Sequence, residues 1–327
     1  MPLKDQFNST QYSTYINNIT ANNSYIKINN NHEKGIVDIY NIFDGVLVLF
    51  ISISSKQWPV ASFSERSDKI FLNYCIKGSC EVSLSNELST CISEDEFSIS
   101  KSSAIKDFSY PLKQYEGIEI ILNINELKPF QDILKNNFDI DINKTLDYYT
   151  LNNSPFIAKA NPKLRELMKK LLKNKNSNTL FEMRINILDL LYLLSKKEIN
   201  SNNKKRTYLT SSQTQIAKSV EKLITKDLQK KITIAKLSKM FSVSETSLKT
   251  YFKSLYGKNI STYLQEIRIN ESAKQIAKTK KSISDIAGMV GYENQSKFAS
   301  VFKSYFKISP IEYRRLNYYR NNNDSKN

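Results

Sequence analysis

Histidine and glycine are scarce in this chain. Of its 327 residues, one is histidine and seven are glycine. The single histidine, His32, excludes metal sites that need two or more imidazole ligands, and its asparagine-rich surroundings are a poor place for a catalytic triad. The sequence contains no glycine-rich phosphate-binding motif of the dinucleotide or P-loop kind. We therefore expect no metal, no cofactor and no enzymatic activity.

Long apolar runs are also missing. A membrane-spanning helix needs about 18 or more consecutive apolar residues, whereas the longest candidate here, residues 45–53, has the length of a buried strand. The N-terminus has no hydrophobic signal core. Cysteine occurs only at Cys75, Cys80 and Cys91, an odd number that is consistent with reduced thiols. These features predict a cytoplasmic protein with no membrane partner.

Acidic residues are scarce in one part of the chain only. Residues 204–327 contain 25 Lys and Arg against 9 Asp and Glu, whereas residues 1–203 contain 23 of each sign. The whole net charge of +16 therefore belongs to the last 124 residues. A neutral part joined to a strongly basic part indicates a sensing or scaffolding domain attached to a domain that meets a polyanion, either nucleic acid or an anionic membrane.

The neutral part begins with a β-rich region. Residues 1–34 are rich in Asn, Ser and Thr, and we expect them to be loosely ordered or to pair with an early strand. From residue 35 onwards, short β-rich runs recur roughly every 8 to 12 residues, a spacing typical of an antiparallel sandwich or small barrel. Gly78-Ser79 and Asn86-Glu87 are plausible hairpin turns. The predicted strands cover residues 46–54, 69–78, 80–86, 96–101, 107–112 and 117–124.

A helical section follows the predicted strands. Apolar residues recur at helical spacing over 125–138, 162–173 and 179–197. The third of these helices is apolar on more than one face and so needs two partners. The β-rich region can be one partner, and the other is either a second subunit or the rest of the same domain. Residues 35–197 are thus predicted to form a regulatory domain with dimerisation helices, followed by a linker at 198–210.

The basic part is predicted to be entirely α-helical over residues 211–320, ahead of a disordered tail at 321–327. Seven short helices are expected, at 212–225, 233–241, 244–255, 261–279, 284–290, 294–305 and 310–318. Side chains suited to capping a helix N-terminus stand at the start of five of them: Thr233, Ser244, Ser261, Ser284 and Asn294. The chain is therefore expected to have an α+β fold, with an antiparallel β domain first and an all-α domain last.

Two stretches of the all-α domain share one plan. Each has a short helix, a tight turn and a longer helix with a common apolar seam, the pattern of a helix-turn-helix motif whose second helix can lie in the major groove of DNA. The first motif covers about residues 233–256 and the second about 284–306. A duplicate is a much stronger signal than a single copy. The lysines are spread over several short helices rather than along one amphipathic helix, which favours DNA over a membrane.

A signature of spaced residues runs through both motifs. In the second it reads Ile283, Ile286-Ala287, Val290-Gly291-Tyr292, Phe298, Phe302-Lys303, Ser309-Pro310 and Tyr313-Arg314. In the first it reads Leu237-Ser238, Ser244, Leu248, Phe252-Lys253, Gly257, Tyr263-Leu264 and Arg268. These residues resemble the AraC/XylS family of bacterial transcription regulators. Lys307 departs from the glycine that the family usually has before the Ser-Pro pair, so a differently shaped turn is expected there.

The resemblance implies a sequence-specific transcriptional activator or repressor whose partners are double-stranded operator DNA and RNA polymerase. The helix at 261–279 would hold two recognition helices in successive major grooves, about 34 Å apart. Base-edge contacts, for which hydroxyl, amide and ammonium groups are suited, are implied for Thr246, Lys249 and Thr250, and for Ser296, Lys297 and Ser300. Four neighbouring residues complete the predicted DNA-binding set: Ser247, Lys253, Asn294 and Gln295. Phosphate contacts are expected from Lys218, Lys222, Lys230, Lys231, Lys258, Lys280 and Lys281.

Looser motifs run through the β-rich region. They are Phe43-Asp44-Gly45, Asn73 to Gly78 with Cys80-Glu81, Phe97 to Ser100, Tyr110-Pro111-Leu112 and Tyr115 to Ile118. They resemble the sensor domain of the PchR-like branch, regulators of siderophore and iron uptake. The resemblance implies a cupin-like fold and a small effector such as an iron chelate. Trp58, Tyr74 and Tyr110 are aromatic candidates for an effector pocket, with a place in the apolar core as the alternative.

Two other functions compete with this one. Thiol chemistry at Cys75, Cys80 and Cys91 would make a redox-responsive regulator with the same DNA-binding domain, although a lone cysteine on such a strand is often a small buried hydrophobe. A DNA-repair alkyltransferase carries a similar helical domain. That enzyme needs four zinc-binding cysteines and a Pro-Cys-His acceptor, which three cysteines and one remote histidine do not provide.

Overall fold

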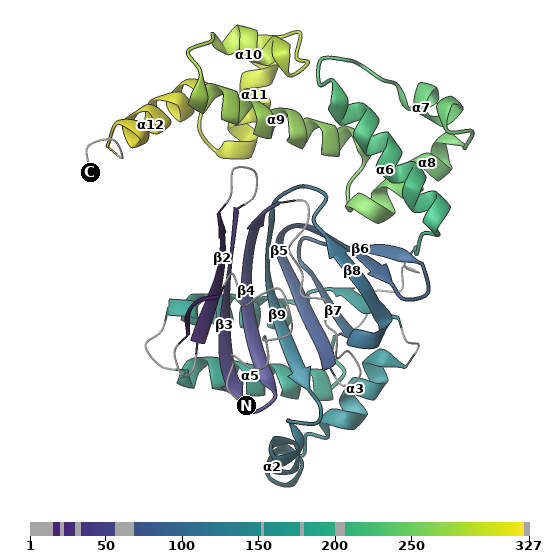
Figure 1. Ribbon diagram of the computed structural model, residues 1–327, viewed down its shortest axis with the longest axis vertical. Coiled ribbons are helices and arrows are strands. Elements are labelled where there is room, and N and C mark those ends of the chain that lie inside the picture. The colour runs from purple at the N-terminus through teal and green to yellow at the C-terminus, as the bar shows by residue number, and fades with distance from the viewer. Residues whose placement is uncertain are drawn as a thin grey trace. The chain divides into compact units, whose positions relative to one another are not determined.

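The computed structural model of the chain divides into two compact units, residues 1–211 and residues 212–327 (Figure 1). It describes residues 16–19, 23–29, 34–55, 69–151, 154–176, 180–199 and 207–323. His32, Trp58, most of the predicted linker and the end of the predicted tail lie outside the described residues. Within the described ranges, no helix is long and apolar enough to cross a membrane.

Unit 1 is built on an antiparallel sheet. Its strands are β1 (Ile16–Ile19), β2 (Asn23–Asn29), β3 (Lys34–Phe43), β4 (Val46–Ser54), β5 (Lys69–Leu84), β6 (Ser89–Ser93), β7 (Glu96–Lys101), β8 (Ile105–Ser109), β9 (Tyr115–Asn123) and β10 (Phe156–Lys159). They are hydrogen-bonded in the order β1-β2-β3-β4-β9-β5-β7-β10, and β6 and β8 both pair with β5. β2 pairs residue by residue with β3. This confirms the expectation that part of residues 1–34 pairs with an early strand, since backbone pairing needs no apolar side chains.

Strand β5 is longer than the sequence predicts. The expected turn at Gly78-Ser79 is wrong, since one strand of 16 residues runs through it. Gly78 has a φ of +86°, and a Cβ there would lie 2.1 Å from the carbonyl oxygen of Gln114. Glycine therefore lets the strand continue past a close backbone contact, with β9 and β7 beside its first part and β6 and β8 beside its second. The turn expected at Asn86-Glu87 is confirmed, with Glu87 at a φ of +62°.

Apolar side chains are buried on both faces of the sheet. One face carries Val48, Leu72 and Ile120 and packs against four helices, which are α2 (Lys128–Phe138), α3 (Ile142–Thr150), α4 (Pro162–Lys173) and α5 (Phe181–Ser195). The opposite face, here called the inner face, carries Leu49 and Phe71 and forms a second apolar cluster with the part of the sheet made by β6 and β8. Because side chains alternate along a strand, burial of both faces requires continuous apolar runs such as residues 46–51.

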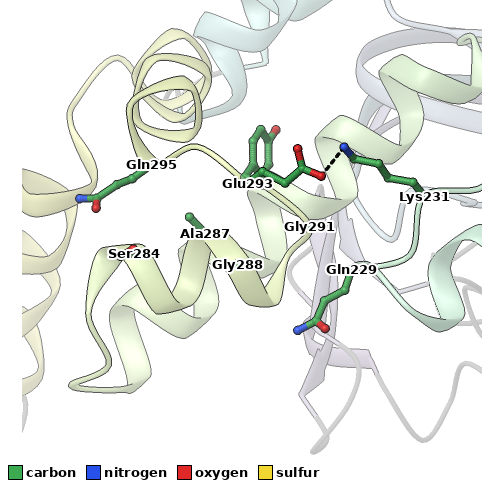
Figure 2. Close-up of a pocket in the computed structure, with 9 residues that line it drawn as sticks. Gln229, Lys231, Ser284, Ala287, Gly288, Gly291, Glu293 and Gln295 are labelled. Carbon is green, nitrogen blue, oxygen red and sulfur yellow. Dashed lines mark hydrogen bonds and ion pairs between the residues drawn. The ribbon is translucent and has the colours of Figure 1, made fainter.

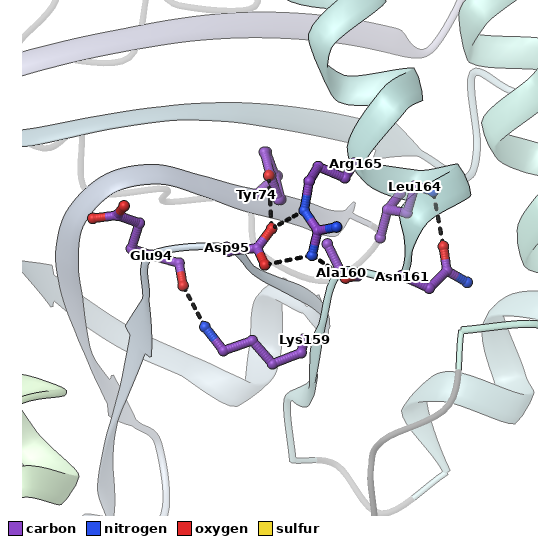
Figure 3. A network of polar contacts seen from close by, with 8 residues as sticks. All are labelled: Tyr74, Glu94, Asp95, Lys159, Ala160, Asn161, Leu164 and Arg165. Carbon is purple, nitrogen blue, oxygen red and sulfur yellow. Dashed lines mark hydrogen bonds and ion pairs between the residues drawn. The ribbon is translucent and has the colours of Figure 1, made fainter.

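A polar network fastens α4 to the sheet (Figure 3). The Arg165 guanidinium donates two hydrogen bonds to the Asp95 carboxylate, at 2.9 and 2.7 Å, and the Tyr74 hydroxyl donates to the same carboxylate at 3.1 Å. The cation holds the pKa of Asp95 below its ordinary value. Tyr74, an aromatic candidate for an effector pocket, is therefore a buried residue of this network and of the apolar core.

The helices of unit 1 follow the predicted positions except for one. Residues 162–173 form α4 as predicted, whereas α3 was not predicted. Two signals were available: Ile142, Leu146 and Tyr149 recur at helical spacing and are buried, and the Asp141 carboxylate caps α3 by accepting the amide of Lys144 at 3.0 Å. Both ends of the predicted linker are also held in unit 1. Ile199 is buried, and Leu209 is buried and exchanges two backbone hydrogen bonds of 2.9 Å with Ser89.

Unit 2 is helical, as predicted. Its helices are α6 (Ser211–Lys226), α7 (Ile234–Met240), α8 (Glu245–Tyr256), α9 (Ile260–Lys278), α10 (Ile283–Met289), α11 (Gln295–Phe306) and α12 (Pro310–Asn323). Three expected N-caps are confirmed, namely Thr233, Ser244 and Asn294. The other two are wrong, because α9 starts after Asn259 rather than Ser261 and α10 after Ser282 rather than Ser284. In both cases a second polar residue two positions earlier offered the same signal.

Candidate nucleic-acid interface

Unit 2 contains two helix pairs of the same design. In each, a seven-residue helix leads through a tight turn to a twelve-residue helix, α7 to α8 and α10 to α11. The second helices start 50 residues apart, at Glu245 and Gln295. Both turns contain a left-handed residue, Ser242 with a φ of +52° and Gly291 with a φ of +83°. The duplication inferred from the sequence is therefore also a duplication of backbone geometry.

Each helix pair has its own aromatic core. In the first pair Leu237, Leu248 and Phe252 are fully buried, and the Phe252 ring meets the ring of Tyr263 in α9 edge-on at 5.3 Å. In the second pair Phe298 and Phe302 take the equivalent places, with their ring centroids 5.7 Å apart. Because the apolar seams are buried, the opposite sides of α8 and α11 are left exposed.

Caps fix the N-termini of α8 and α11. The Ser244 hydroxyl accepts a hydrogen bond from the amide of Ser247 at 3.0 Å and donates to the Ser247 hydroxyl at 2.9 Å. The Asn294 side-chain oxygen accepts the amide of Lys297 at 2.9 Å. Ser247 and Asn294 therefore already have an intramolecular role in shaping the helix start. Their side chains position the neighbouring exposed residues as well as offering polar groups of their own.

The predicted contact residues lie on the exposed sides of the two helices. Thr246, Lys249, Thr250 and Lys253 are exposed and follow the spacing that places residues on one helix face, while Ser247 is half-buried. On α11 and at its cap, Asn294, Gln295, Ser296, Lys297 and Ser300 are all exposed. Lys303, which belongs to the sequence signature but not to the predicted contact residues, is also exposed and stands 50 residues after Lys253. The repeat interval was the signal that could have found it.

Lys249 has a partner on its own helix. Its ammonium lies 3.3 Å from the Glu245 carboxylate one turn earlier, and both side chains are about half exposed, at 52% and 47%. Surface pairs of this kind contribute little to stability, about 0 to 1 kcal/mol. The pair therefore holds the Lys249 side chain on the exposed face of α8. Because the pair is weak, the ammonium group can leave Glu245 and bind another hydrogen-bond acceptor.

A hollow of about 400 Å³ lies beside the start of α11 (Figure 2). Residues from α10, the turn after it, the start of α11 and the segment between α6 and α7 line it, among them Ser284, Gly288, Tyr292, Gln229 and Gln295. Across it the Lys231 ammonium lies 2.6 Å from the Glu293 carboxylate, which lowers the pKa of Glu293. This ion pair joins the segment before the first helix pair to the turn that leads into α11.

Two arginines anchor the segments that precede the helix pairs. Arg268 of α9 donates to the carbonyl of Leu228 at 2.7 Å, and Arg314 of α12 donates to the carbonyl of Lys281 at 2.6 Å. Gly291 is needed beside Arg268, because a Cβ there would lie 2.3 Å from the Leu228 oxygen. Helix α9 has 19 residues, which corresponds to about 28 Å at 1.5 Å per residue. It spans from one helix pair to the other as a single element.

A family model described as a helix-turn-helix domain matches residues 237–316, from α7 into α12. This range contains most of the first helix pair and all of the second. Residues 237–316 therefore form a helix-turn-helix domain. The capped helices and exposed polar faces described above thus belong to this helix-turn-helix domain.

Curated relatives match a larger part of the chain. The HTH-type transcriptional activator CsvR of Escherichia coli is 27% identical over 157 residues, which are 48% of this chain and 55% of that protein. The DNA-binding dual transcriptional regulator Rns of the same organism is 30% identical over 144 residues, 43% of this chain and 52% of that protein. The chain therefore spans about half the length of these relatives.

Solved structures also match the helix-turn-helix domain. The C-terminal domain of AraT, a response regulator from Geobacillus stearothermophilus, is 28% identical and covers 31% of this chain and 84% of its own, with a TM-score of 0.30. That score is too low to add to the assignment.

Proposed function

We propose that this protein is a sequence-specific DNA-binding transcription regulator of the AraC type. The observation that carries the proposal is the repeated helix pair, with two capped twelve-residue helices 50 residues apart and a polar, basic face on each. Both pairs are helix-turn-helix motifs in this proposal, and α8 and α11 enter successive major grooves of one duplex. The helix-turn-helix family match and the regulators among the relatives support it.

The exposed residues of α8 and α11 read bases in this proposal. Lys249 and Lys297 donate to guanine, Asn294 and Gln295 pair with adenine, and the hydroxyls of Thr246, Ser247, Thr250, Ser296 and Ser300 contact bases or phosphates, with Lys253 at the edge of the face. Lysines outside these helices contact phosphates and give affinity without sequence information. Two of these lysines already form ion pairs, Lys231 with Glu293 and Lys258 with Glu266. Each ion pair would have to break before its lysine could contact a phosphate.

The test is a direct measurement of sequence preference. Genomic sites would be found by immunoprecipitation and sequencing, and the affinity of the full chain would then be compared on the recovered sequence and on a scrambled duplex. We expect specific binding at least about 10³-fold tighter than non-specific binding. Equal affinity for both duplexes at several salt concentrations would overturn the proposal and leave a non-specific polyanion binder. Neighbouring genes and a promoter reporter would show whether RNA polymerase is activated or blocked.

Unit 1 is proposed to be the regulatory domain, with a cupin-like sheet that binds a small effector. Its antiparallel sheet, which buries an apolar cluster on each face, supports this role. An effector shifts the regulator only if it binds one state more tightly than another. The resemblance to the PchR-like branch makes an iron chelate one candidate effector. Calorimetry of the full chain with ferric chelates tests it, and the absence of heat with each chelate would remove this candidate.

Helix α5 supports a homodimer. Its buried residues face the sheet, while Phe181, Ile185 and Tyr192 remain 66%, 48% and 49% exposed and form one stripe with the half-buried Leu188. Glu182 at the start of the helix and Lys196 after its end flank the same side of this stripe. In an antiparallel pair of α5 helices, Glu182 of one copy would face Lys196 of the other. We therefore propose that a second copy of the chain packs against the exposed stripe of α5.

Sedimentation of the full chain tests the dimer. Ile185→Asp places a charge in the stripe and is expected to give monomers, whereas Lys173→Asp on exposed α4 surface is the matched control. A wild-type chain that remains monomeric at 100 μM, or an Ile185→Asp variant that remains dimeric, would overturn this arrangement. An unchanged melting temperature of the variant would show that the fold is intact.

The competing functions have less support. Burial raises the pKa of the Cys75 and Cys80 thiols, and Cys91 is also buried, so none is a ready thiolate for redox sensing or alkyl transfer. One relative is named a bifunctional transcriptional activator and DNA repair enzyme, AdaA of Bacillus subtilis, and is 28% identical over 97 residues. We propose that this chain shares only the regulator's role with it.

A further inference from the structure

Glu119 occupies the middle of the inner face. It lies on β9, between β4 and β5, and stands opposite Leu49 on one side and Asn73 on the other. Side chains two residues apart share a sheet face, so Glu119 is on the same side as Tyr115 and Ile121, which belong to the inner apolar cluster. A carboxyl group therefore sits among apolar side chains at the centre of the proposed regulatory domain.

Two polar groups continue from Glu119 along the inner face. The Tyr115 hydroxyl donates a hydrogen bond of 2.9 Å to the side-chain oxygen of Asn73. Tyr115 reaches Asn73 across Gly117 of its own strand, where a Cβ would lie 2.4 Å from the hydroxyl oxygen. Any larger residue at position 117 would displace the ring. The Tyr115 ring also lies against that of Tyr110, with centroids 4.7 Å apart.

Glu119 differs from its polar neighbours in having no partner. Among the described residues, none donates a hydrogen bond to its carboxylate or forms an ion pair with it. Burial raises the pKa of Glu119 to about 7. Its side chain is nevertheless only partly buried, so an external group can reach it. A partnerless carboxyl in an apolar setting costs stability, and the fold gives no structural reason for it.

We infer that the inner face of unit 1 is a small-molecule site in which Glu119 receives a cationic or hydrogen-bond-donating group of the ligand. The row of Tyr115 and Asn73 orients the ligand beside this carboxylate, and the rings of Tyr115 and Tyr110 with Leu49 and Phe71 take its apolar body. The ligand class is an organic ammonium compound with an apolar or aromatic part. This inference rests on the proposed regulatory role of unit 1 and names the chemistry of its effector.

The charge of the site distinguishes this ligand class from others. An anionic iron chelate would be repelled by the ionised Glu119, and a purely apolar ligand would leave the carboxyl without a partner. A ligand ammonium group instead neutralises the carboxylate and stabilises its ionised form. The same two partners, a carboxylate and aromatic faces, are what proteins use to hold ammonium groups.

Phenethylammonium is the probe for this site, with 3-phenylpropionate as its anionic counterpart of similar size. Thermal unfolding of the full chain would be followed at increasing probe concentration. We expect phenethylammonium to raise the unfolding midpoint of the wild type and 3-phenylpropionate to leave it unchanged. Glu119→Gln should weaken the response at least ten-fold, whereas the matched control Glu116→Gln, an exposed residue near the start of the same strand that does not belong to the inner face, should retain it.

Several outcomes would overturn the inference. It is wrong if phenethylammonium does not stabilise the wild type, if the anion stabilises it equally, or if Glu119→Gln responds like the wild type. The ligand-site proposal and the DNA-binding proposal can be separated by measuring sequence-specific DNA affinity without the probe. The same three proteins would be used: the wild type, Glu119→Gln and Glu116→Gln. Loss of sequence-specific binding in the wild type would contradict the DNA-binding function while leaving the ligand result to be judged on its own.

Discussion

Gly257 and Lys307 occupy the same place in the two helix pairs. Gly257 follows α8 with a φ of 70° and ψ of −6°, and Lys307 follows α11 with a φ of 66° and ψ of 0°. Each donates its amide to the carbonyl oxygen four residues earlier, at 2.8 Å. The expectation that Lys307 gives the second turn a different shape is therefore wrong. The lysine adopts the left-handed conformation that glycine favours, at a cost of about 1 kcal/mol.

Exchanging these two residue types should change stability in opposite directions. Lys307→Gly removes the left-handed strain and is expected to stabilise unit 2 by about 1 kcal/mol, whereas Gly257→Lys introduces it and should destabilise by a similar amount. Urea unfolding of the full chain, followed by helical circular dichroism, measures both. A destabilised Lys307→Gly variant would show that the hydrogen bond from its ammonium to the carbonyl of Ser304 outweighs the backbone strain.

Base reading by α8 and α11 predicts a loss of specificity rather than of general affinity. Lys249→Ala and Lys297→Ala should each weaken binding to the recovered operator by about 1 to 3 kcal/mol and leave binding to scrambled DNA nearly unchanged. Fluorescence anisotropy on both duplexes measures this difference. Lys173→Ala, in α4 of unit 1, is the control with the same charge change. Equal losses on both duplexes would instead assign phosphate contacts to the two lysines.

The sequence predicted those features that depend on local periodicity. The continuous apolar run of β4 and the seams of α7, α8, α10 and α11 are each visible in a short window, and so are the caps Ser244 and Asn294. The continuity of β5 through Gly78 was not visible, because it depends on the backbone of Gln114, which is 36 positions away in the chain. Glu119 was missed for a related reason. Its lack of a partner follows from the neighbours that sheet register gives it, Leu49 and Asn73.

The Asp95 network should stabilise unit 1 mainly above acidic pH. Asp95→Asn removes the negative charge that Arg165 and Tyr74 share, and a loss of about 1 to 2 kcal/mol is expected for these partly exposed groups. Because Arg165 depresses the pKa of Asp95 in the folded state, its contribution is present above the unfolded pKa and is lost as pH falls through the folded pKa. Denaturant midpoints at pH 3 and pH 6 would show a smaller difference between wild type and variant at pH 3 than at pH 6. Glu94→Gln changes the exposed residue next to Asp95 and should have the wild-type midpoint at both pH values.

Glu119 predicts the opposite pH dependence between pH 5 and 8. Its pKa rises from an ordinary 4.5 to about 7 on folding, so the folded state binds the proton more tightly. The resulting stability is fully present below the unfolded pKa and is lost as pH rises through the folded pKa. The titratable groups near it on the inner face, Cys80 and Tyr115, have pKa values raised by burial and stay neutral in this window.

Denaturant unfolding at pH 5, 6, 7 and 8 measures this contribution. The wild type should lose stability as pH rises, most steeply near pH 7, while Glu119→Gln should lose less because a neutral amide has no proton to release. Glu116→Gln, exposed on the same strand, should keep the wild-type slope. Identical slopes for Glu119→Gln and the wild type would show that Glu119 titrates normally, and its carboxylate would then be solvated rather than held in an apolar setting. A saturating concentration of phenethylammonium should flatten the wild-type slope, since a bound cation stabilises the ionised carboxylate.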